Sequence, residues 1–423
     1  MARVKSAPSQ VIGSGDVRIL LIYPYAGIDS NSTMALLLEN LAGRGAHVDV
    51  LVKPGTEFAK PERFGDTIHL EPQAESSLYP LLRRVLPERV RLFLARHRSR
   101  SASAAPPQAL IERLTARRYA LLIGVDPFGL ITADRLAPWT QAPLAYVSFE
   151  MIFEDELRTR VERALLEMEH AACRRVALVL SPDVERAELF CREHSFPLDR
   201  VVTAPVAPPP ADVPKSSILR DMFGIPAGAR IVLYAGALEE WACPEEMAAM
   251  VAHWPEAYHL VIHRNSMRTG RAIRHLRRSA KAGRIHISSE PVARHDLPRL
   301  IASADFGLAP YRPVPGDWWT GKNIYHLGLS SGKVSFYAMC GLPILARSLP
   351  VFDREFARYK CGLVYREVAE TGDLLTEMDA RYADHSDEAR RFYRERLNPV
   401  AGITRFCDGL MRLATAPPAP GDR

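Results

Sequence analysis

The chain has 423 residues, of which 47% are hydrophobic and 25% are charged, and this composition excludes a disordered or fibrous protein. At about 150 residues per domain, the length predicts two to three domains with sizeable cores. The net charge of +6 is compatible with nucleic acid, an anionic membrane surface or phosphorylated small molecules as partners, and charge alone does not choose among them.

The cysteines and the apolar runs point to the compartment. The six cysteines are scattered without a Cys-x-x-Cys pair, which disfavours a disulfide framework and a thiolate zinc site and favours a reducing environment. The first 16 residues hold no apolar run of seven or more residues, so we expect no secretory signal. No apolar stretch approaches the ~20 residues needed to span a bilayer. We therefore expect a cytoplasmic protein without a membrane-spanning helix.

The N-terminal half alternates strands with helices. The apolar run 17–23 predicts a strand buried on both faces, and a helix over 31–41 and a strand from residue 46 follow it. This order of strand, helix and strand is typical of a parallel, doubly wound domain. The alternation continues with predicted strands at 119–129, 142–150 and 176–181 and a helix at 158–174.

A proline-rich segment separates the two halves of the chain. Five prolines lie between Pro205 and Pro214, a density that no helix or central strand tolerates, so we place the interdomain linker at 205–217. Five further apolar segments after the linker predict a second doubly wound domain. They are 230–238, 258–265, 284–292, 305–311 and 342–348.

The expected fold is therefore α/β, with two doubly wound Rossmann-like domains facing a cleft. The predicted parts are an N-terminal extension (1–16), an N-terminal domain (17–204), the linker (205–217), a C-terminal domain (218–398), a C-terminal helix that could return to the N-terminal domain (399–413) and a disordered tail (414–423).

The segment 328–345, with sequence GLSSGKVSFYAMCGLPIL, carries the clearest chemical signal. Ser330, Ser331 and Gly332 are typical of a loop and helix N-cap, and Lys333 opens a predicted helix that ends before Gly341. Free backbone N–H groups, two hydroxyls and a lysine at a helix start can bind a phosphate or diphosphate. The alternative is a well-capped helix with a solvated lysine.

This segment resembles the stretch that lies against the donor diphosphate and ribose in the group-1 family of retaining glycosyltransferases, which have the GT-B fold. Other blocks are similar as well: the glycine-ending strand IVLYAGALEEW, the loop SSEPVARHDLPRLIASADFGLAPY, the strand CGLVYRE and, in the N-terminal half, the LAYVSFE and SPD blocks. The resemblance implies a nucleotide-sugar donor in the C-terminal domain and an acceptor in the N-terminal domain. It implies donor-binding roles for Gly236, Arg264, Glu290, Pro291, Val292, Ser330, Ser331, Gly332, Lys333 and Ser335.

One departure from the family concerns a pair of glutamates. Many members have two glutamates in this stretch, the second three positions after the lysine, where it binds the ribose hydroxyls. The corresponding positions here are Gly328 and Phe336. Ser335 is the remaining candidate for a ribose contact, as a weaker, uncharged partner.

Four residues are candidates for the chemistry. Lys333 and Arg264 could stabilise the charge that develops on a leaving diphosphate. Asp126 and Glu150 follow predicted N-terminal strands, where they could contact an acceptor hydroxyl or act as a base. The alternatives are a helix N-cap for Asp126 and an interdomain salt bridge for Glu150. The resemblance favours retention of configuration, for which no dedicated base is needed.

Two basic stretches add a possible membrane contact. Eight basic residues and no acidic residue lie between Arg264 and Arg284, and most of them are expected on a solvated helix face. The arginines from Arg83 to Arg100 are interleaved with leucines and valines, as in a helix that lies on an anionic membrane, although packing against the N-terminal domain is the alternative. Neither stretch has the interleaved aromatics of a nucleic-acid-binding domain.

The first hypothesis is thus a glycosyltransferase that moves a sugar from a nucleotide-diphosphate donor to an unknown acceptor. Because the sequence has no Asp-x-Asp motif, we expect neither a metal ion nor another cofactor. The second hypothesis is a catalytically weak scaffold of the same fold that binds nucleotide or a partner protein, as the missing glutamates suggest. A nucleotide-sugar epimerase is a third possibility, for which no residue argues specifically.

Overall fold

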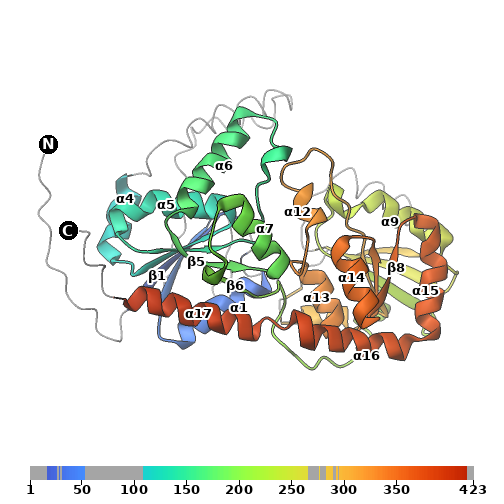
Figure 1. Cartoon of the computed structure of the whole chain (residues 1–423). Coiled ribbons are helices and arrows are strands. Elements are labelled where there is room, and N and C mark those ends of the chain that lie inside the picture. Colours follow the sequence, from blue (N-terminus) through green and yellow to red (C-terminus); the bar gives the residue numbers. More distant parts are fainter. Residues whose placement is uncertain are drawn as a thin grey trace, which may run out of the picture.

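The structure is a computed structural model, and it describes residues 17–25, 28, 31–52, 108–264, 276, 283–288, 292–293 and 295–416. Within these residues the chain forms two α/β domains that lie side by side (Figure 1). The prediction of two doubly wound α/β domains is therefore confirmed.

The N-terminal domain is built on a six-stranded parallel sheet with the strand order β2-β1-β3-β4-β5-β6. The strands are β1 (Arg18–Tyr23), β2 (His47–Val52), β3 (Leu121–Val125), β4 (Leu144–Val147), β5 (Val176–Ser181) and β6 (Val201–Thr203). The helices are α1 (Ser32–Gly43), α4 (Gln108–Arg117), α5 (Asp126–Thr140), η3 (Glu154–Glu156), α6 (Arg160–Cys173), α7 (Val184–His194) and η4 (Leu198–Arg200).

The C-terminal domain repeats this plan, with the strand order β12-β11-β10-β7-β8-β9 and parallel pairing throughout. The strands are β7 (Arg230–Ala235), β8 (Tyr258–His263), β9 (Ile285–Ser288), β10 (Phe306–Ala309), β11 (Ile344–Arg347) and β12 (Gly362–Tyr365). The helices are α8 (Ile218–Phe223), η5 (Glu240–Ala242), α9 (Pro244–Met250), η6 (Val251–His253), α11 (Leu297–Ile301), α12 (Lys322–Tyr325), α13 (Gly332–Met339), α14 (Pro350–Tyr359), η8 (Val368–Glu370), α15 (Thr371–Ala380), α16 (Tyr382–Phe392), η9 (Tyr393–Leu397) and α17 (Val400–Thr415).

The continuous apolar runs form strands because both faces of each sheet are covered. Along β1, Ile19 and Leu21 pack into one core cluster, whereas Leu20 and Ile22 pack into the cluster on the opposite face. The same alternation divides β7 between two further clusters. Since successive side chains of a strand point to opposite faces, a strand covered on both sides is apolar at every position.

The linker is held between the domains by hydrogen bonds to backbone groups. The Thr33 hydroxyl of α1 donates to the Pro205 carbonyl (3.4 Å) and accepts from the Ala207 amide (3.2 Å). The Tyr393 hydroxyl of η9 donates to the Pro208 carbonyl (2.7 Å). Prolines have no amide hydrogen to satisfy, which suits a segment that crosses between domains without strand partners.

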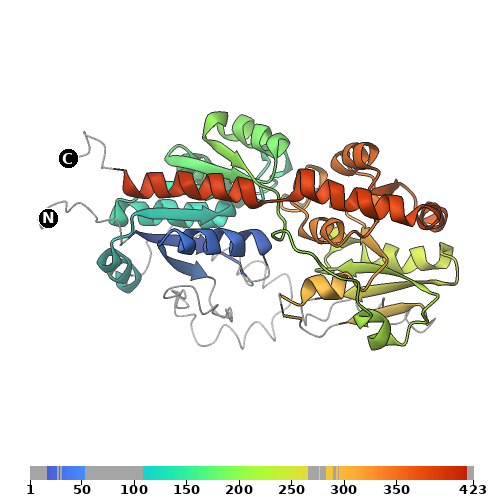
Figure 2. The ribbon, with the colours of Figure 1, turned by 90° about the horizontal axis from the view of Figure 1, so that it is seen from below.

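Helix α17 crosses back to the N-terminal domain after α16 and η9 have packed on the C-terminal one. Its buried side chains belong to the same core cluster as those of α1 and β1, and Figure 2 shows it lying along that domain beside α1. It approaches β6 so closely that a Cβ on Gly402 would lie 2.3 Å from the Thr203 carbonyl oxygen. The helix continues past residue 413 to Thr415, so the predicted tail begins too early.

Candidate functional site

The helix start predicted at 330–333 is present, and hydroxyl groups hold it. The Ser331 side chain is the N-cap of α13 and accepts a hydrogen bond from the Val334 amide (3.3 Å). The Tyr311 hydroxyl, just after β10, lies 2.6 Å from Ser331 Oγ, and the Ser330 hydroxyl donates to the Leu327 carbonyl (2.5 Å). Gly332 and Lys333 form the first turn of α13, where amide groups have no helical acceptor.

Three aromatic rings surround the ammonium group of Lys333. Its Nζ lies 4.5 Å from the ring centre of Tyr234, 4.6 Å from that of Tyr311 and 5.0 Å from that of Trp241. It also donates to the Tyr234 hydroxyl (3.2 Å). A cation is attracted to ring faces at these distances. Burial nevertheless lowers the pKa of Lys333 to about 7.

Gly236 lies directly against this lysine, at the bend after β7. Its φ of +152° belongs to the region that favours glycine, and a Cβ there would lie 2.9 Å from Lys333 Cε. The Gly236 amide donates to the His263 carbonyl (2.9 Å), so the ends of β7 and β8 are joined beside the lysine. The structure therefore brings together Gly236 and Lys333, two of the predicted donor-binding residues.

Of the other predicted donor-binding residues, the structure describes Arg264 and Val292 but not Glu290 and Pro291. Arg264 follows β8 and is 3% exposed, and its amide donates to the Ser288 carbonyl at the end of β9 (3.0 Å). Val292 packs, partly buried, against the C-terminal core. Glu290 and Pro291 lie outside the described residues.

Ser335 is committed to the fold. It is completely buried, and its hydroxyl donates to the Val206 carbonyl of the linker (2.9 Å) and to the Ser331 carbonyl (3.1 Å). The predicted contact between this hydroxyl and a ribose is wrong for this geometry, because α13 turns Ser335 toward the linker. Its role is to attach α13 to the linker.

At the two positions that carry glutamates in the resembled family, neighbouring protein groups leave no room for a ligand-binding carboxylate. Phe336 is buried in the core of the C-terminal domain. Gly328 has a φ of +55°, and a Cβ there would lie 2.0 Å from Oδ2 of Asp183 in the N-terminal domain. A glutamate at position 328 is thus incompatible with this arrangement of the two domains, because the Asp183 carboxylate occupies the space.

Asp183 belongs to a polar interface that the sequence analysis missed. Its Oδ1 caps α7 by accepting from the Arg186 amide (2.9 Å), and its Oδ2 accepts from the Leu329 amide of the other domain (2.7 Å). Arg186 is 1% exposed and donates across the interface to the His326 carbonyl (2.7 Å) and to Asn323 Oδ1 (3.2 Å). The SPD block resembles the family, but no local sequence pattern predicts these contacts between the domains.

Asp126 and Glu150 meet at the carboxyl ends of β3 and β4. Asp126 is buried, with φ +55°, and its Oδ1 accepts hydrogen bonds from the amides of Phe149 (2.8 Å) and Glu150 (2.9 Å). Burial raises the pKa of Asp126 to about 6, although both hydrogen bonds oppose the rise. The Asp126 carboxylate therefore orders the loop after β4.

Glu150 is half-buried, and its carboxyl lies near enough to Arg186 and Asp126 to interact with their charges. Burial raises the pKa of Glu150 to about 8 against the opposing charge of Arg186, and the charge of Asp126 raises it further. The interdomain salt bridge considered as an alternative is not formed by Glu150 among the described residues.

A second charged cluster was also missed. Arg312, after β10, and Arg347, at the end of β11, both contact the Glu246 carboxylate of α9. The Arg312 amide donates to the Trp241 carbonyl (2.9 Å), which connects this cluster to the aromatic rings around Lys333. The two guanidinium groups share one carboxylate, so the cluster keeps a net positive charge.

Of the other basic residues predicted from the sequence, Arg284 is described by the structure and the segment from Arg83 to Arg100 is not. Arg284 donates to the carbonyls of Val251 (2.7 Å), Trp254 (3.1 Å) and Pro255 (2.9 Å), which gives it a structural role. The segment from Arg83 to Arg100 lies outside the described residues, so the membrane-surface contact stays a prediction.

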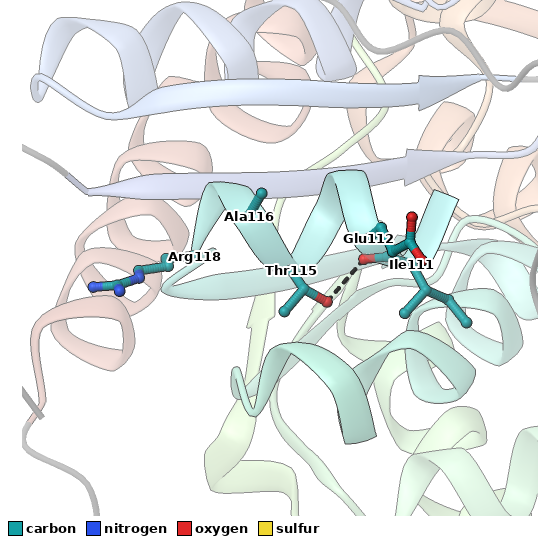
Figure 3. A pocket seen from close by; sticks show the side chains of 5 residues that line it. All are labelled: Ile111, Glu112, Thr115, Ala116 and Arg118. Atoms are coloured by element: carbon teal, nitrogen blue, oxygen red, sulfur yellow. Dashed lines mark hydrogen bonds between the residues drawn. The ribbon is translucent and has the colours of Figure 1, made fainter. Parts of the chain in front are cut away.

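An open pocket lies along α4, lined by Ile111, Glu112, Thr115, Ala116 and Arg118 (Figure 3). The Thr115 hydroxyl donates to the Ile111 carbonyl (2.8 Å), which closes a turn of the helix. Residues 53–107, which are not described, run directly into α4, so we assign no function to this pocket.

The described residues contain neither a membrane-spanning helix nor a cluster of metal ligands. None of their helices combines the length and the apolar character that crossing a membrane requires. In the same part of the chain, no three His, Cys, Asp or Glu side chains gather where they could hold a metal ion.

Comparison with known proteins gives results only at the level of structure. The sequence matches no protein-family model and no curated protein. HepE of Anabaena, solved with UDP and glucose, has a TM-score of 0.65 and 13% identity over 93% of this chain and 99% of its own.

Two other solved structures are similar over nearly the whole chain. Sucrose-phosphate synthase of Thermosynechococcus elongatus has a TM-score of 0.63 and 16% identity, covering 94% of this chain and 98% of its own. A Listeria monocytogenes protein assigned as a UDP-N-acetylglucosamine 2-epimerase has a TM-score of 0.57 and 14% identity, covering 94% and 95%. Identities this low establish a shared architecture, and the protein has the GT-B fold.

Proposed function

We propose that the protein is a glycosyltransferase that transfers a sugar from a nucleotide-diphosphate sugar to an acceptor bound by the N-terminal domain. The observation that supports this most directly is the start of α13. There, Lys333 and the first-turn amides lie beside Gly236, at the carboxyl end of a parallel sheet. Ligands of open α/β sheets bind at such ends, and helix starts favour anions.

In this proposal, Lys333 and the N-terminus of α13 bind the donor diphosphate, and Arg264 adds positive charge from the end of β8. These groups would stabilise the negative charge that builds up on the diphosphate as the bond to the sugar breaks. Because UDP and glucose are bound in HepE, a UDP-sugar is the first donor to test. The proposal includes retention of configuration, because the α13 segment resembles the donor-binding stretch of retaining glycosyltransferases.

The test begins with donor binding. Thermal unfolding of the wild type is measured with UDP, GDP, ADP, dTDP and CMP, because a ligand that binds only the folded state raises the melting temperature. We expect one nucleoside diphosphate to stabilise the wild type and to lose this effect in Lys333→Ala. A second measurement follows UDP-glucose by NMR, since transfer to water releases UDP whereas epimerisation leaves the nucleotide-sugar intact.

The outcomes separate the hypotheses. Release of nucleoside diphosphate supports a transferase, and an α-configured sugar product from an α-configured donor supports retention. Binding without any turnover would favour the catalytically silent scaffold. Absence of nucleotide binding would contradict the proposed donor site.

A further inference from the structure

The loop after β4 is held by three polar side chains that all act on its backbone. Asp126 accepts from the amides of Phe149 (2.8 Å) and Glu150 (2.9 Å). Arg186 donates to the Phe149 carbonyl (2.5 Å). Asn323 of the other domain accepts from the Met151 amide (2.9 Å) and donates to the Met151 carbonyl (2.7 Å).

These tethers fix the backbone on both sides of Glu150. Asp126, Arg186 and Asn323 are each at most 3% exposed, and they come from α5, α7 and α12. Hydrogen bonds made by buried polar groups are stronger and more directional than exposed ones. The position of Glu150 is therefore set by both domains at once.

The Glu150 side chain, unlike the backbone on either side of it, is not held by hydrogen bonds to the described residues. Among the described residues, the Glu150 carboxyl has no hydrogen bond and no ion pair within 4.0 Å. The charged and titratable groups that face it are Asp126 on α5, Arg186 on α7 and Tyr25 after β1. A half-buried carboxyl that has no partner among the described residues can accept or donate a hydrogen bond to a ligand, and carboxyl groups with shifted pKa values concentrate at functional sites.

We propose that Glu150 binds the nucleophilic hydroxyl of the acceptor as a neutral carboxylic acid, and that Asp126, Arg186 and Asn323 are its positioning residues. This inference rests on the proposed function and goes beyond it by assigning the acceptor-binding group. A neutral carboxyl has one acceptor oxygen and one O–H donor. It therefore matches a pair of adjacent hydroxyls, which makes a sugar or another polyol the class of acceptor.

The reaction then balances without any proton transfer to or from Glu150, which stays protonated throughout. The acceptor oxygen forms a bond to the anomeric carbon while the bond between that carbon and the diphosphate oxygen breaks. The electron pair leaves with the nucleoside diphosphate, and one of its oxygens takes the acceptor's proton. Glu150 only holds the acceptor hydroxyl toward the anomeric carbon.

The titration of Glu150 supports this neutral role. Since its pKa is raised to about 8, the carboxyl is mostly protonated at pH 7 and ionises as the pH rises through 8. The neighbouring charge of Asp126 contributes to the raised pKa, so Asp126 influences the reaction through Glu150.

Water is the acceptor used for the test, with UDP-glucose as the donor. UDP release at saturating donor is measured from pH 6 to 9 for the wild type, Glu150→Gln, Glu150→Ala and Asp126→Asn, and donor affinity is measured by calorimetry for each. Melting temperatures show which variants are folded. Donor binding and UDP release by the wild type test the proposed function, and the comparison among variants tests Glu150.

We expect Glu150→Ala to bind UDP-glucose within about twofold of the wild type and to release UDP about tenfold more slowly or worse. Glu150→Gln, which is neutral and has the same shape, retains most of the rate and loses the decline above pH 8. Asp126→Asn moves that decline to lower pH, because it removes the negative charge that helps to keep Glu150 protonated.

Contrary results are equally clear. An inactive Glu150→Gln would identify a general base and overturn the neutral role. Equal rates of UDP release in Glu150→Ala and the wild type would overturn the assignment of Glu150. If the wild type binds neither UDP-glucose nor a nucleoside diphosphate, or binds UDP-glucose without releasing UDP, the proposed function fails first.

Discussion

Removal of the Lys333 amine is the sharpest perturbation of the proposed donor site. Lys333→Met keeps the aliphatic stem among Tyr234, Trp241 and Tyr311 but removes the charge that the diphosphate would meet. A hydrogen bond to a charged group contributes about 1.5–3 kcal/mol. We therefore expect donor affinity to fall about 10- to 150-fold at pH 6, where the wild-type lysine is charged.

The pH dependence gives a second, independent magnitude. Burial lowers the pKa of Lys333 to about 7, so the fraction of free protein with a charged lysine falls from about 0.9 at pH 6 to about 0.1 at pH 8. If only the charged form binds the diphosphate, affinity falls about tenfold between these pH values. Binding at pH 8 is then accompanied by uptake of about one proton.

Calorimetry measures both quantities. The titrant is UDP-glucose, because both of its phosphates are esterified and it lacks the terminal phosphate that titrates near pH 6. Titrations at pH 6 and pH 8 give the affinities, and titrations in two buffers with different ionisation enthalpies give the proton uptake. Lys360→Met is the matched control, since this lysine is exposed on the same domain.

The same pKa shift has a consequence for stability without donor. The folded state binds its proton with a pKa of about 7, below the ordinary lysine value of 10.5. Between these values the unfolded chain binds more protons, so wild-type stability gains a contribution as the pH rises through this window. Lys333→Met loses that contribution. A donor affinity that is equal at pH 6 and pH 8 in the wild type, with no proton uptake, would refute the reasoning.

Three further predictions concern the domain interface and are measured by urea unfolding and by donor titration. Gly328→Ala is expected to destabilise the protein by about 1–3 kcal/mol, because the added Cβ would collide with the Asp183 carboxylate and the backbone φ at this position is positive. Unchanged stability would show that the domains separate easily. Arg186→Ala should cost about 3–5 kcal/mol, since it leaves several buried carbonyls unpaired across the interface, and a loss below 1 kcal/mol would contradict this. Ser335→Ala should cost about 1 kcal/mol through the lost bond to Val206 and leave donor affinity unchanged, whereas a large loss of affinity would restore its ribose role.

The missing glutamates of the resembled family have a physical explanation in this fold. The Asp183 carboxylate of the N-terminal domain fills the space beside Gly328. It accepts a hydrogen bond from the Leu329 amide (2.7 Å). The interface thus uses a carboxylate from the opposite domain at this position, to hold the domains together.

Much of the fold could be read from the sequence because it depends on local patterns. Both sheets were predicted from short apolar runs, since strands covered on both faces are apolar at every position. The short strand β6 (Val201–Thr203) was missed because three residues give no period. The strand predicted over 119–129 ends at Val125, where Asp126 begins α5.

Only the local features of the candidate site could be predicted from the sequence. The N-cap at Ser331 and the placement of Lys333 in the first helical turn follow from residue types and spacing alone. The direction of Ser335 did not follow, because a serine one turn into a helix can face a ligand or the linker depending on how the helix is rotated. That rotation is set by packing against the rest of the domain.

What the sequence by itself determined is every strand except β6, the proline linker and the helix start that presents Lys333. The tertiary structure decided which distant residues meet: the three rings around Lys333 come from separate elements, and Arg186 reaches the His326 carbonyl 140 residues away. It also decided that Glu150 is held from both domains while its carboxyl stays unpaired among the described residues. Such contacts depend on how two finished domains pack, and no local pattern of residues encodes that packing.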